Sequence, residues 1–425
     1  MENRLFEFIE KSPTAFHTAA TLARRLTGEG YTELYEGDGW ELKDGGRYFM
    51  RRGSSSLIAF RYNASAGGFV IAASHSDTPA FRIKASPELA GAYNRADVEK
   101  YGGPILYSWL DRPLSVAGRV FVRTEAGARE LLVNVERDLF VIPSVAIHLN
   151  RGVNDGYKFN PAVDMLPLFS KGNEKGALLG IVAEAAGVCP TDIISHDLFL
   201  YNRMSPTRFG AAGEFIASPR IDDLASVFAT AEGFLTAAEC NSLPVLAVFD
   251  NEEVGSSTRE GAASSLLISV LTRIAGERLP SMLAGSVMAS VDNAHALHPN
   301  HPELSDKENA PLLAGGVVIK HNAQQRYATD GVSEALIRLV AERAGVPLQD
   351  YHNRADIPGG STLGTIADVL VPIPTADIGL PQLAMHSSVE CAALEDINSL
   401  ITLCRALFSS EITARADALS LSVKL

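Results

Sequence analysis

Cysteine is scarce in this sequence of 425 residues: the four present form no C-x-x-C pair and stand at Cys189, Cys240, Cys391 and Cys404. Four such cysteines are too few for a disulfide framework, so we expect free thiols in a reducing compartment. Basic residues are also in deficit, because 37 Lys and Arg stand against 50 Asp and Glu, which gives a formal net charge of -13. Nucleic acids and anionic membranes attract basic surfaces, so this charge disfavours both as partners.

Long apolar runs are missing as well, since no stretch approaches the ~18 to 20 residues of a membrane span. The segment 1–16 carries Glu2, Arg4, Glu7 and Glu10 among its apolar positions, so it lacks the uninterrupted apolar run of a signal peptide. The composition, 46% hydrophobic and 20% charged, is typical of an ordinary globular protein. We therefore expect a cytoplasmic protein without a membrane partner.

A chain of this length exceeds what one core usually holds, so we expect two domains. Apolar spacing predicts helices at 5–26 (interrupted at Ser12-Pro13), 223–240, 264–276, 331–344 and 394–408. Strands of the same style are predicted at 56–62, 68–73, 244–249 and 287–291. Strands that alternate with helices indicate a layered α/β domain.

The middle of the chain, from about 79 to 218, has a different texture. It shows alternating strands at 114–123 and 130–135, many glycines and prolines, and one good helical stretch at 175–186. Strands of the α/β style stand on both sides of it. We therefore predict an α/β domain made of 1–80 and 219–425, with a mostly β domain, 81–218, inserted into it.

The segment FDNEEVGSS (249–257) places Glu252 and Glu253 side by side directly after an apolar run. That run, 244–249, predicts a buried strand of a largely parallel sheet. Adjacent residues of a strand point to opposite sides. At the carboxyl end of such a strand, the two glutamates can therefore serve two neighbouring roles at a ligand crevice.

Acidic and imidazole groups gather in five short stretches, after apolar strands or in turn-rich loops: SHSDTP (74–79), RIDDL (220–224), DNEEVG (250–255), VDNAHALHPN (291–300) and MHSSVE (385–390). Taken singly, a His or Asp at a strand end is more often a cap or turn residue than a ligand. Taken together, crowded carboxylates are costly without a cation, and a divalent metal removes that cost. Two histidines and three carboxylates suffice for two zinc ions ~3.5 to 4 Å apart with one bridging carboxylate, and one further carboxylate is then free to act as a base.

These stretches, together with QRYATD (325–330) and DIPGGSTLG (356–364), resemble the M18 aminopeptidases, whose best-known members are aspartyl aminopeptidases, within the wider clan of co-catalytic zinc exopeptidases. The resemblance runs from SPTAFH (12–17) to the last helix and so covers nearly the whole chain. It implies a three-layer α/β sandwich as the catalytic domain. It also implies that the inserted β domain serves dimerisation or oligomerisation, in large tetrahedral dodecamers.

The resemblance implies a pair of zinc ions in each subunit, although other divalent cations are possible. His75 and Asp292 would bind one ion, Glu253 and His386 would bind the other, and Asp222 would bridge the two.

The same resemblance implies supporting roles. Glu252 would be the general base, and a cis peptide bond would follow Asp222. Asp77 would orient the ring of His75, or else would only cap the turn at Thr78-Pro79. His295 would lie near the substrate and polarise its scissile carbonyl group.

Substrate-binding residues are carried over as His148, Gln324, Arg326, Tyr327 and Met385. His148 resembles a histidine that reaches from one subunit into the active site of another, or it is a surface histidine of the insert. Gln324 departs from the pattern, because some aspartyl-preferring relatives place a lysine just before the Gln-Arg-Tyr motif. The sequence therefore leaves open an acidic, a neutral or a broader preference for the first residue of the substrate.

The leading prediction is a metalloaminopeptidase that releases N-terminal residues from peptides with a free amino terminus, through a water activated by Glu252. One alternative is a carboxypeptidase or deacylase of the same clan. Another is a non-catalytic assembly or cargo-binding protein that keeps the fold. Retention of Glu252 with every ligand disfavours the last, because a scaffold needs no base.

Overall fold

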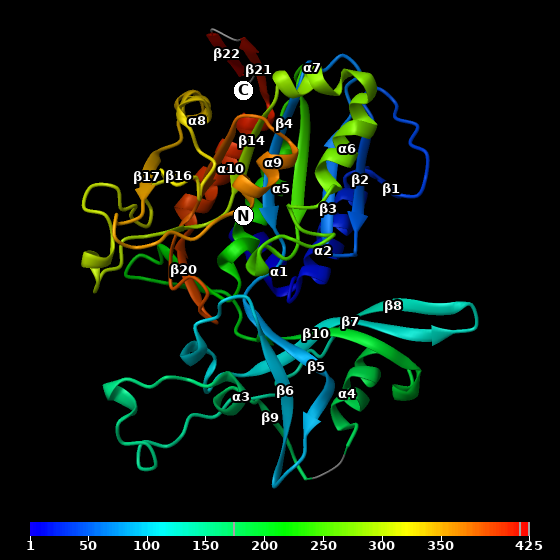
Figure 1. The fold of residues 1–425 in the computed structure, drawn as a ribbon, viewed down its shortest axis with the longest axis vertical. Coiled ribbons are helices and arrows are strands. Elements are labelled where there is room, and N and C mark those ends of the chain that lie inside the picture. Colours follow the sequence, from blue (N-terminus) through cyan, green and yellow to red (C-terminus); the bar gives the residue numbers. More distant parts are fainter. Residues whose placement is uncertain (173–174, 416–417, 424–425) are drawn as a thin grey trace.

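The structure, a computed structural model, describes residues 1–172, 175–415 and 418–423. It has a layered part that contains both ends of the described chain and a β-rich part below it, formed by the middle of the chain (Figure 1). The chain passes from the layered part into the β-rich part directly after β4. This connection therefore lies beside the carboxyl edge of the main sheet.

The layered part is built on one mixed sheet of nine strands. In spatial order they are β1 (Thr32–Leu34), β2 (Arg47–Arg52), β3 (Ser56–Arg61), β13 (Leu243–Phe249), β4 (Phe69–His75), β14 (Val287–Val291), β18 (Thr375–Gly379), β16 (Val317–His321) and β17 (Leu348–His352). The central strands β13, β4, β14 and β18 run parallel to one another. Every residue of these four strands is buried, as expected for parallel strands covered on both faces.

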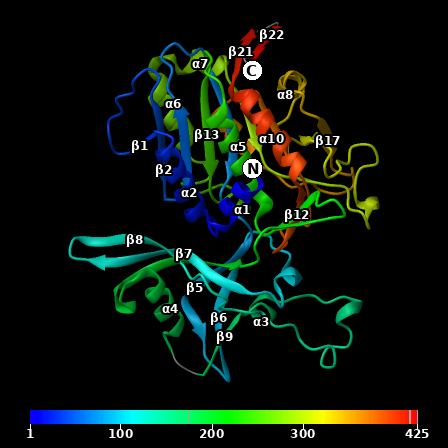
Figure 2. The ribbon, with the colours of Figure 1, turned by 180° about the vertical axis from the view of Figure 1, so that it is seen from behind.

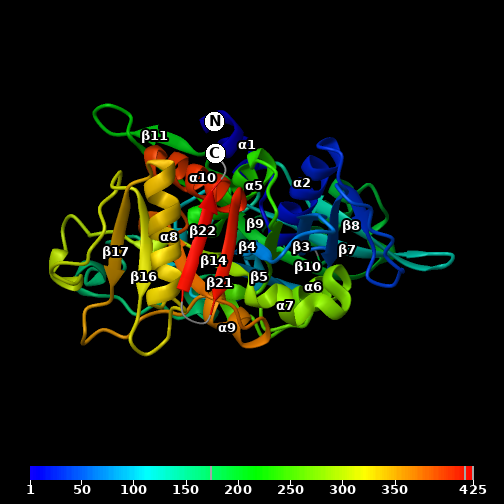
Figure 3. The same ribbon diagram turned by 90° about the horizontal axis from the view of Figure 1, so that it is seen from above.

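Helices cover both faces of this sheet (Figures 2 and 3). One face carries α1 (Glu2–Glu10), α2 (Ala15–Gly28), α5 (Ile221–Thr236), α8 (Gly331–Ala344) and α10 (Leu394–Phe408). The other face carries α6 (Leu266–Ala275), α7 (Leu279–Ala284) and α9 (Leu363–Leu370). A hairpin of β21 (Ser410–Arg415) and β22 (Ala418–Val423) follows α10.

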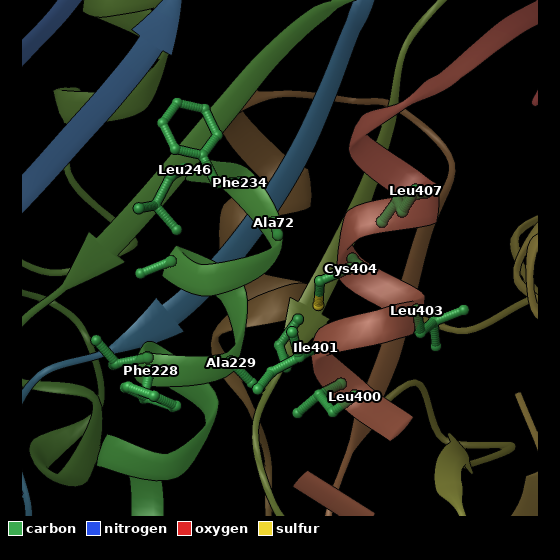
Figure 4. Close-up of a cluster of buried hydrophobic side chains, with 14 of the residues drawn as sticks. Ala72, Phe228, Ala229, Phe234, Leu246, Leu400, Ile401, Leu403, Cys404 and Leu407 are labelled. Atoms are coloured by element: carbon green, nitrogen blue, oxygen red, sulfur yellow. The ribbon is translucent and has the colours of Figure 1, made fainter. Parts of the chain in front are cut away.

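Successive residues of the central strands enter two different cores. Val70 and Ala72 of β4 pack in the core under α5 and α10, whereas Ile71 and Ala73 pack in the core under α6 and α9. This follows from the alternation of side chains along a strand. Figure 4 shows the first core, where Leu400, Ile401 and Cys404 of α10 lie on the side that faces α5. The predicted three-layer α/β sandwich is therefore confirmed.

The β-rich part has its own antiparallel sheet of six strands. In spatial order they are β8 (Gly127–Asn134), β7 (Leu114–Thr124), β10 (Ile193–Asn202), β5 (Ala80–Leu89), β6 (Tyr93–Tyr101) and β9 (Leu168–Lys171). The helix α4 (Ala177–Ala186) packs on this sheet, and a short helix α3 (Pro161–Asp164) lies in the long connection before β9. A separate apolar core, which includes Phe81, Leu178 and Leu198, fills this part.

A third sheet joins the end of the insert to the last part of the chain. Its order is β11 (Thr207–Phe209), β12 (Phe215–Ser218), β20 (Glu390–Ala393), β19 (Pro381–Leu383) and β15 (Ala294–His295). Thus β12, which precedes residue 219, pairs with β20 of the layered part. The domain bounds 1–80 with 219–425 and 81–218 stay a prediction.

The predicted elements are present, with shifted ends in places. Helices 331–344 and 394–408 and strand 287–291 are confirmed to the residue. The helix predicted to reach residue 240 ends at Thr236, because the backbone of the next residues is used by other segments: Ala237 accepts a hydrogen bond from Arg61 at 2.8 Å, and Ala238 donates one to Ser409 at 2.9 Å. Tertiary contacts therefore override helical propensity at this end.

Candidate active site

The carboxyl ends of three adjacent parallel strands deliver the first group of site residues. β4 ends on His75, Glu252 and Glu253 follow β13, and Asp292 follows β14. β4 pairs with β13 on one side and with β14 on the other, and Phe249 lies directly opposite His75. Since the strands run in one direction, their last residues share one edge of the sheet.

Two further residues reach this edge from other elements. Asp222 lies in the first turn of α5, where its φ of -82° and ψ of 108° are not helical. His386 lies between β19 and β20 with a positive φ of 67°. The peptide bond from Asp222 to Asp223 is cis, as predicted, and Asp223 accepts the backbone N–H of His75 at 3.1 Å.

The two carboxylate oxygens of Asp222 face different histidines. Its Oδ1 lies 3.3 Å from Nε2 of His75, and its Oδ2 lies 3.6 Å from Nε2 of His386. The His75 nitrogen is also 3.7 Å from Oδ1 of Asp292, and the His386 nitrogen is 3.6 Å from Oε2 of Glu253. Two ligand atoms of one tetrahedral zinc ion, each about 2.1 Å from it, lie about 3.4 Å apart. All four separations are close to this distance between two ligand atoms, and all four exceed the usual N–H···O hydrogen-bond distance.

Three buried oxygens of this cluster lack hydrogen-bond partners among the described residues. Oδ1 of Asp222, Oδ1 of Asp223 and Oε1 of Glu253 are buried and accept no hydrogen bond from the described residues. A buried carboxylate oxygen without a donor is costly unless a cation stands beside it. The donor set of imidazole nitrogens and carboxylate oxygens is one that zinc takes. The residues present therefore fit a pair of divalent cations.

The electrostatics of the cluster agree with that fit. Burial, and then the charges of nearby carboxylates such as Asp292, raise the pKa of Glu252 to about 8. Burial and the charge of Asp222 raise the pKa of Glu253 well above its usual range. Both pKa values are raised because several negative charges lie close together where water is excluded. A divalent cation beside them reverses this effect and stabilises the anionic forms.

Asp77 ties the two glutamates to the first histidine. Its carboxylate accepts the backbone N–H groups of Glu252 and Glu253, each at 3.1 Å, and the hydroxyl of Tyr101 at 2.7 Å. The backbone carbonyl of Asp77 lies 3.0 Å from Nδ1 of His75. Because a carbonyl only accepts, Nδ1 carries the proton and Nε2 keeps its lone pair for a metal.

Glu390 ties Asp222 to His386 in a similar way. Its carboxylate accepts the backbone N–H of Asp222 at 2.9 Å through one oxygen and that of His386 at 2.8 Å through the other. Glu390 is buried, so these charge-assisted hydrogen bonds are not screened by water. One side chain thus fixes the spacing of two segments 164 positions apart, from Asp222 to His386.

Lys320 supplies a positive charge beside Asp292. It is 1% exposed, and its ammonium lies 3.2 Å from Oδ2 of Asp292. Burial alone would lower the pKa of Lys320, but the carboxylates of Asp292 and Asp377 raise it above its usual range. Asp377 in turn accepts hydrogen bonds from the hydroxyl of Thr362 and the N–H of Ala328. Asp377, whose charge acts on Lys320, is thus held by the segments that precede α8 and α9.

Comparison with known proteins decides the family. A family described as "Aminopeptidase I zinc metalloprotease (M18)" matches residues 8–408. The probable M18 family aminopeptidase 2 of Clostridium novyi (strain NT) is 41% identical over 411 residues, which are 93% of this chain and 95% of the relative. This chain belongs to the M18 family. The resemblance seen in the sequence is thereby confirmed, as is the predicted enzyme class of metalloaminopeptidase.

Solved structures agree with this M18 assignment. A chain in the cryo-EM structure of the Ape4 and Nbr1 complex superposes with a TM-score of 0.92 at 33% identity, covering 95% of this chain and 84% of that chain. The mApe1 dodecamer of S. cerevisiae superposes with a TM-score of 0.84 at 26% identity, covering 96% and 97%. No helix among the described residues combines the length and apolarity needed to cross a bilayer.

The residues predicted to bind substrate lie in different settings. His295 is exposed and its ring contacts that of Tyr351. Gln324 and Arg326 are exposed in the loop after β16, whereas Tyr327 is buried, with the ammonium of Lys320 at 5.2 Å from its ring centroid.

The other two predicted substrate residues also differ. Met385 is half-buried directly before His386. His148 is exposed in a turn of the insert, and it is not among the grouped His, Asp and Glu residues of the site. Their roles in an M18 active site stay predictions.

Sequence reasoning missed several residues that hold the M18 site together. No role is predicted from the sequence for Lys320, Glu390, Tyr101 or Gly103. The carbonyl of Gly103 lies 3.1 Å from Nδ1 of His386. One signal was present in the sequence: Lys320 is the only charged residue of an otherwise apolar run, 317–320. A lysine in such a run needs a buried partner. Glu390 is the last residue of MHSSVE (385–390), but nothing in its spacing indicates that it binds backbone N–H groups.

Proposed function

We propose that this M18 protein is a dinuclear zinc aminopeptidase, in which His75 and Asp292 hold one ion, Glu253 and His386 hold the other, and Asp222 bridges them. The observation that carries the proposal is the position of Asp222. Its two oxygens face two different imidazoles at 3.3 and 3.6 Å, separations that suit shared tetrahedral ions.

Zinc ions bound here supply positive charge that lowers the pKa of a water and polarises the substrate carbonyl. Glu252 is the group that takes the proton from this water. Its neighbour Glu253 faces His386, and the proposed ligand set leaves the Glu252 carboxylate free to act as the base. Asp77 fixes the backbone of both glutamates, so the base keeps its position during proton transfer. Glu252 then delivers the proton to the leaving amine.

The substrate is a peptide with a free amino terminus. The side of the cluster at His386 is open, because the side chain of this ligand is 34% exposed while that of His75 is 1% exposed. A peptide therefore approaches from the His386 side. Preference for an acidic first residue requires a cation in the 323–327 region, and Arg326 is the charged side chain there, whereas Gln324 is neutral.

The protein acts as a homo-oligomer. Val145, Ile147 and Leu149 are exposed apolar side chains that flank His148 on the insert. Exposed apolar side chains gathered in one segment are typical of an interface. The dodecameric mApe1 shares this fold, which makes a dodecamer the first expectation. The net charge of -13 and the scarcity of cysteine favour the cytoplasm over a membrane, nucleic-acid or oxidising setting.

The adjacent glutamates offer a matched pair for the test. Glu252→Gln should keep two zinc ions and lower kcat by about 10² to 10⁴-fold, because it removes only the base. Glu253→Gln should lose occupancy of one ion. Metal content and the hydrolysis of a panel of acidic, neutral and basic aminoacyl substrates are measured for both variants and the native protein. If the native protein binds two ions but hydrolyses none of the substrates, the result would instead support a non-catalytic assembly protein.

A further inference from the structure

The segment 101–105 of the insert lies directly against the ligands of one proposed metal subsite. Its carbonyl at Gly103 holds Nδ1 of His386 at 3.1 Å, and the N–H of Ile105 donates to the backbone carbonyl of His386 at 2.9 Å. Both the ring and the backbone of this ligand are thus held by the insert. As a carbonyl only accepts, Gly103 also selects the tautomer that leaves Nε2 of His386 free for a metal.

Gly102 brings the same segment against the other ligand of this subsite. Its φ is +69°, in the region that favours glycine, and a Cβ placed on it would stand 3.1 Å from Cβ and 3.3 Å from Oε2 of Glu253. Glycine is therefore favoured here for two reasons, the backbone conformation and the close approach to Glu253.

Tyr101 extends these contacts to the loop that carries the glutamates. Its hydroxyl donates to Oδ2 of Asp77 at 2.7 Å and accepts from the side-chain amide of Asn251 at 2.8 Å. Asp77 in turn accepts the N–H of Glu253. Three consecutive residues at the end of β6 therefore contact the surroundings of Glu253 and His386.

The other subsite is held by different parts of the chain. The ring of His75 is held by the carbonyl of Asp77, two residues further on, at 3.0 Å. Asp292 is held by Lys320 at 3.2 Å, on a neighbouring region of the main sheet. Among the contacts of the described residues, the insert therefore orients the ligands of one subsite much more directly than those of the other.

We infer that segment 101–105 is a positioning element for the Glu253/His386 subsite. The metal affinity of this subsite therefore depends on the position of the insert, whereas that of the His75/Asp292 subsite does not. The inference rests on the proposed dinuclear function. Its physical basis is that a metal binds tightly when its ligands are already oriented by their own hydrogen-bond partners. A displacement of the insert, for example on assembly with other subunits, then changes the occupancy of one ion only.

The test is a zinc titration of the metal-free full-length protein, with the two binding steps assigned through the ligand variants His75→Ala and His386→Ala. Gly102→Ala should weaken the step assigned to His386 by about 10- to 100-fold and leave the other step unchanged. Gly187→Ala is the matched control, because Gly187 also lies in the insert and has a similar φ of +68°, but a Cβ placed on it would meet nothing within 4 Å. This control should leave both steps unchanged.

The outcomes separate the inference from the proposed function. A native protein that binds fewer than two zinc ions overturns the dinuclear proposal itself. Two ions with unchanged affinities in Gly102→Ala overturn the inference alone, and so does an equal weakening of both steps, which would indicate general damage. If Gly102→Ala does not fold, Gly102→Asn replaces it, because Asn tolerates a positive φ while its Cβ still meets Glu253. Thermal unfolding of each metal-free variant checks that the fold is retained.

Discussion

Replacement of Lys320 by methionine should make the stability of this protein depend strongly on zinc. The lysine is fully buried, and its ammonium is 3.2 Å from Asp292 and 3.3 Å from the backbone carbonyl of Asn293. Methionine keeps most of the side-chain volume and removes the charge. In the metal-free protein the carboxylate of Asp292 then has no counter-charge from residue 320. Removal of one partner of a buried ion pair lowers the free energy of unfolding by about 3 to 5 kcal/mol.

Zinc should recover part of that loss. The ion proposed at His75 and Asp292 offers the carboxylate a new counter-charge, so it stabilises the variant more than it stabilises the native protein. By linkage, the affinity of the variant for this ion must rise by the same free energy that zinc recovers. A recovery of about 1.4 kcal/mol corresponds to a tenfold gain in affinity.

The assay is urea unfolding of the native protein and of Lys320→Met, each with chelator and with saturating zinc. Lys307→Met is the control, since Lys307 is exposed and its removal should change the unfolding free energy by less than about 0.5 kcal/mol. The reasoning is refuted if Lys320→Met is as stable as the native protein in chelator, or if it loses the same free energy with and without zinc.

Two further perturbations test other parts of the same framework. Glu390→Gln places one donor where two backbone N–H groups of Asp222 and His386 need acceptors, so zinc affinity should fall about 10- to 100-fold in a zinc titration. Acidification should destabilise the fold through His17, because burial lowers the pKa of this histidine to about 4. The unfolded chain takes up a proton near pH 6.5, so stability is complete above that pH and declines by about 3 kcal/mol as the pH falls from 6.5 to 4.

Each of these has its own control. Glu277→Gln changes an exposed glutamate and should leave zinc affinity unaltered; an equal loss in both variants would show that the buried position of Glu390 is irrelevant. His17→Gln removes the titrating group, so its unfolding free energy should vary less between pH 6.5 and 4 than that of the native protein. Parallel pH profiles for the two proteins would contradict the assignment to His17.

Sequence reasoning succeeds for this chain where a segment is apolar throughout or regularly spaced. The bounds of α8 are predictable because Asp330 closes a capping box at its start and Gly345 ends it in the left-handed region. Strand β18, TADIG, is not predicted, although all its residues are buried. Its Asp377 reads as a surface charge, and only the folded structure shows the hydroxyl of Thr362 and the amide of Ala328 that satisfy it.

In the candidate site, too, some residues are predictable from the sequence and others are recognised only in the folded structure. The proposed ligands His75 and Asp292 follow from motifs, and their convergence follows from the rule that parallel strands end at one edge. Asp222 and His386 come from other elements, so this rule does not place them. The supporting groups do not follow, because they act through backbone N–H and C=O groups that every residue possesses. Glu390 binds the N–H of Asp222, and the carbonyl of Gly103 binds His386 across 283 positions, so no side-chain pattern marks either contact.

The order of the strands in the main sheet has a consequence for biosynthesis. β3 and β4 are near neighbours in the sequence, yet β13 lies between them in the sheet. At a synthesis rate of about 5 to 20 residues per second, the roughly 170 residues that separate β4 from β13 take about 10 to 30 s to emerge from the ribosome. During that interval the insert itself is being synthesised, β3 exposes one unpaired edge, and β4 exposes both of its edges because β14 also follows later in the chain. The nascent chain therefore depends on delayed pairing or on chaperone cover for the two apolar strands that later form the centre of the enzyme.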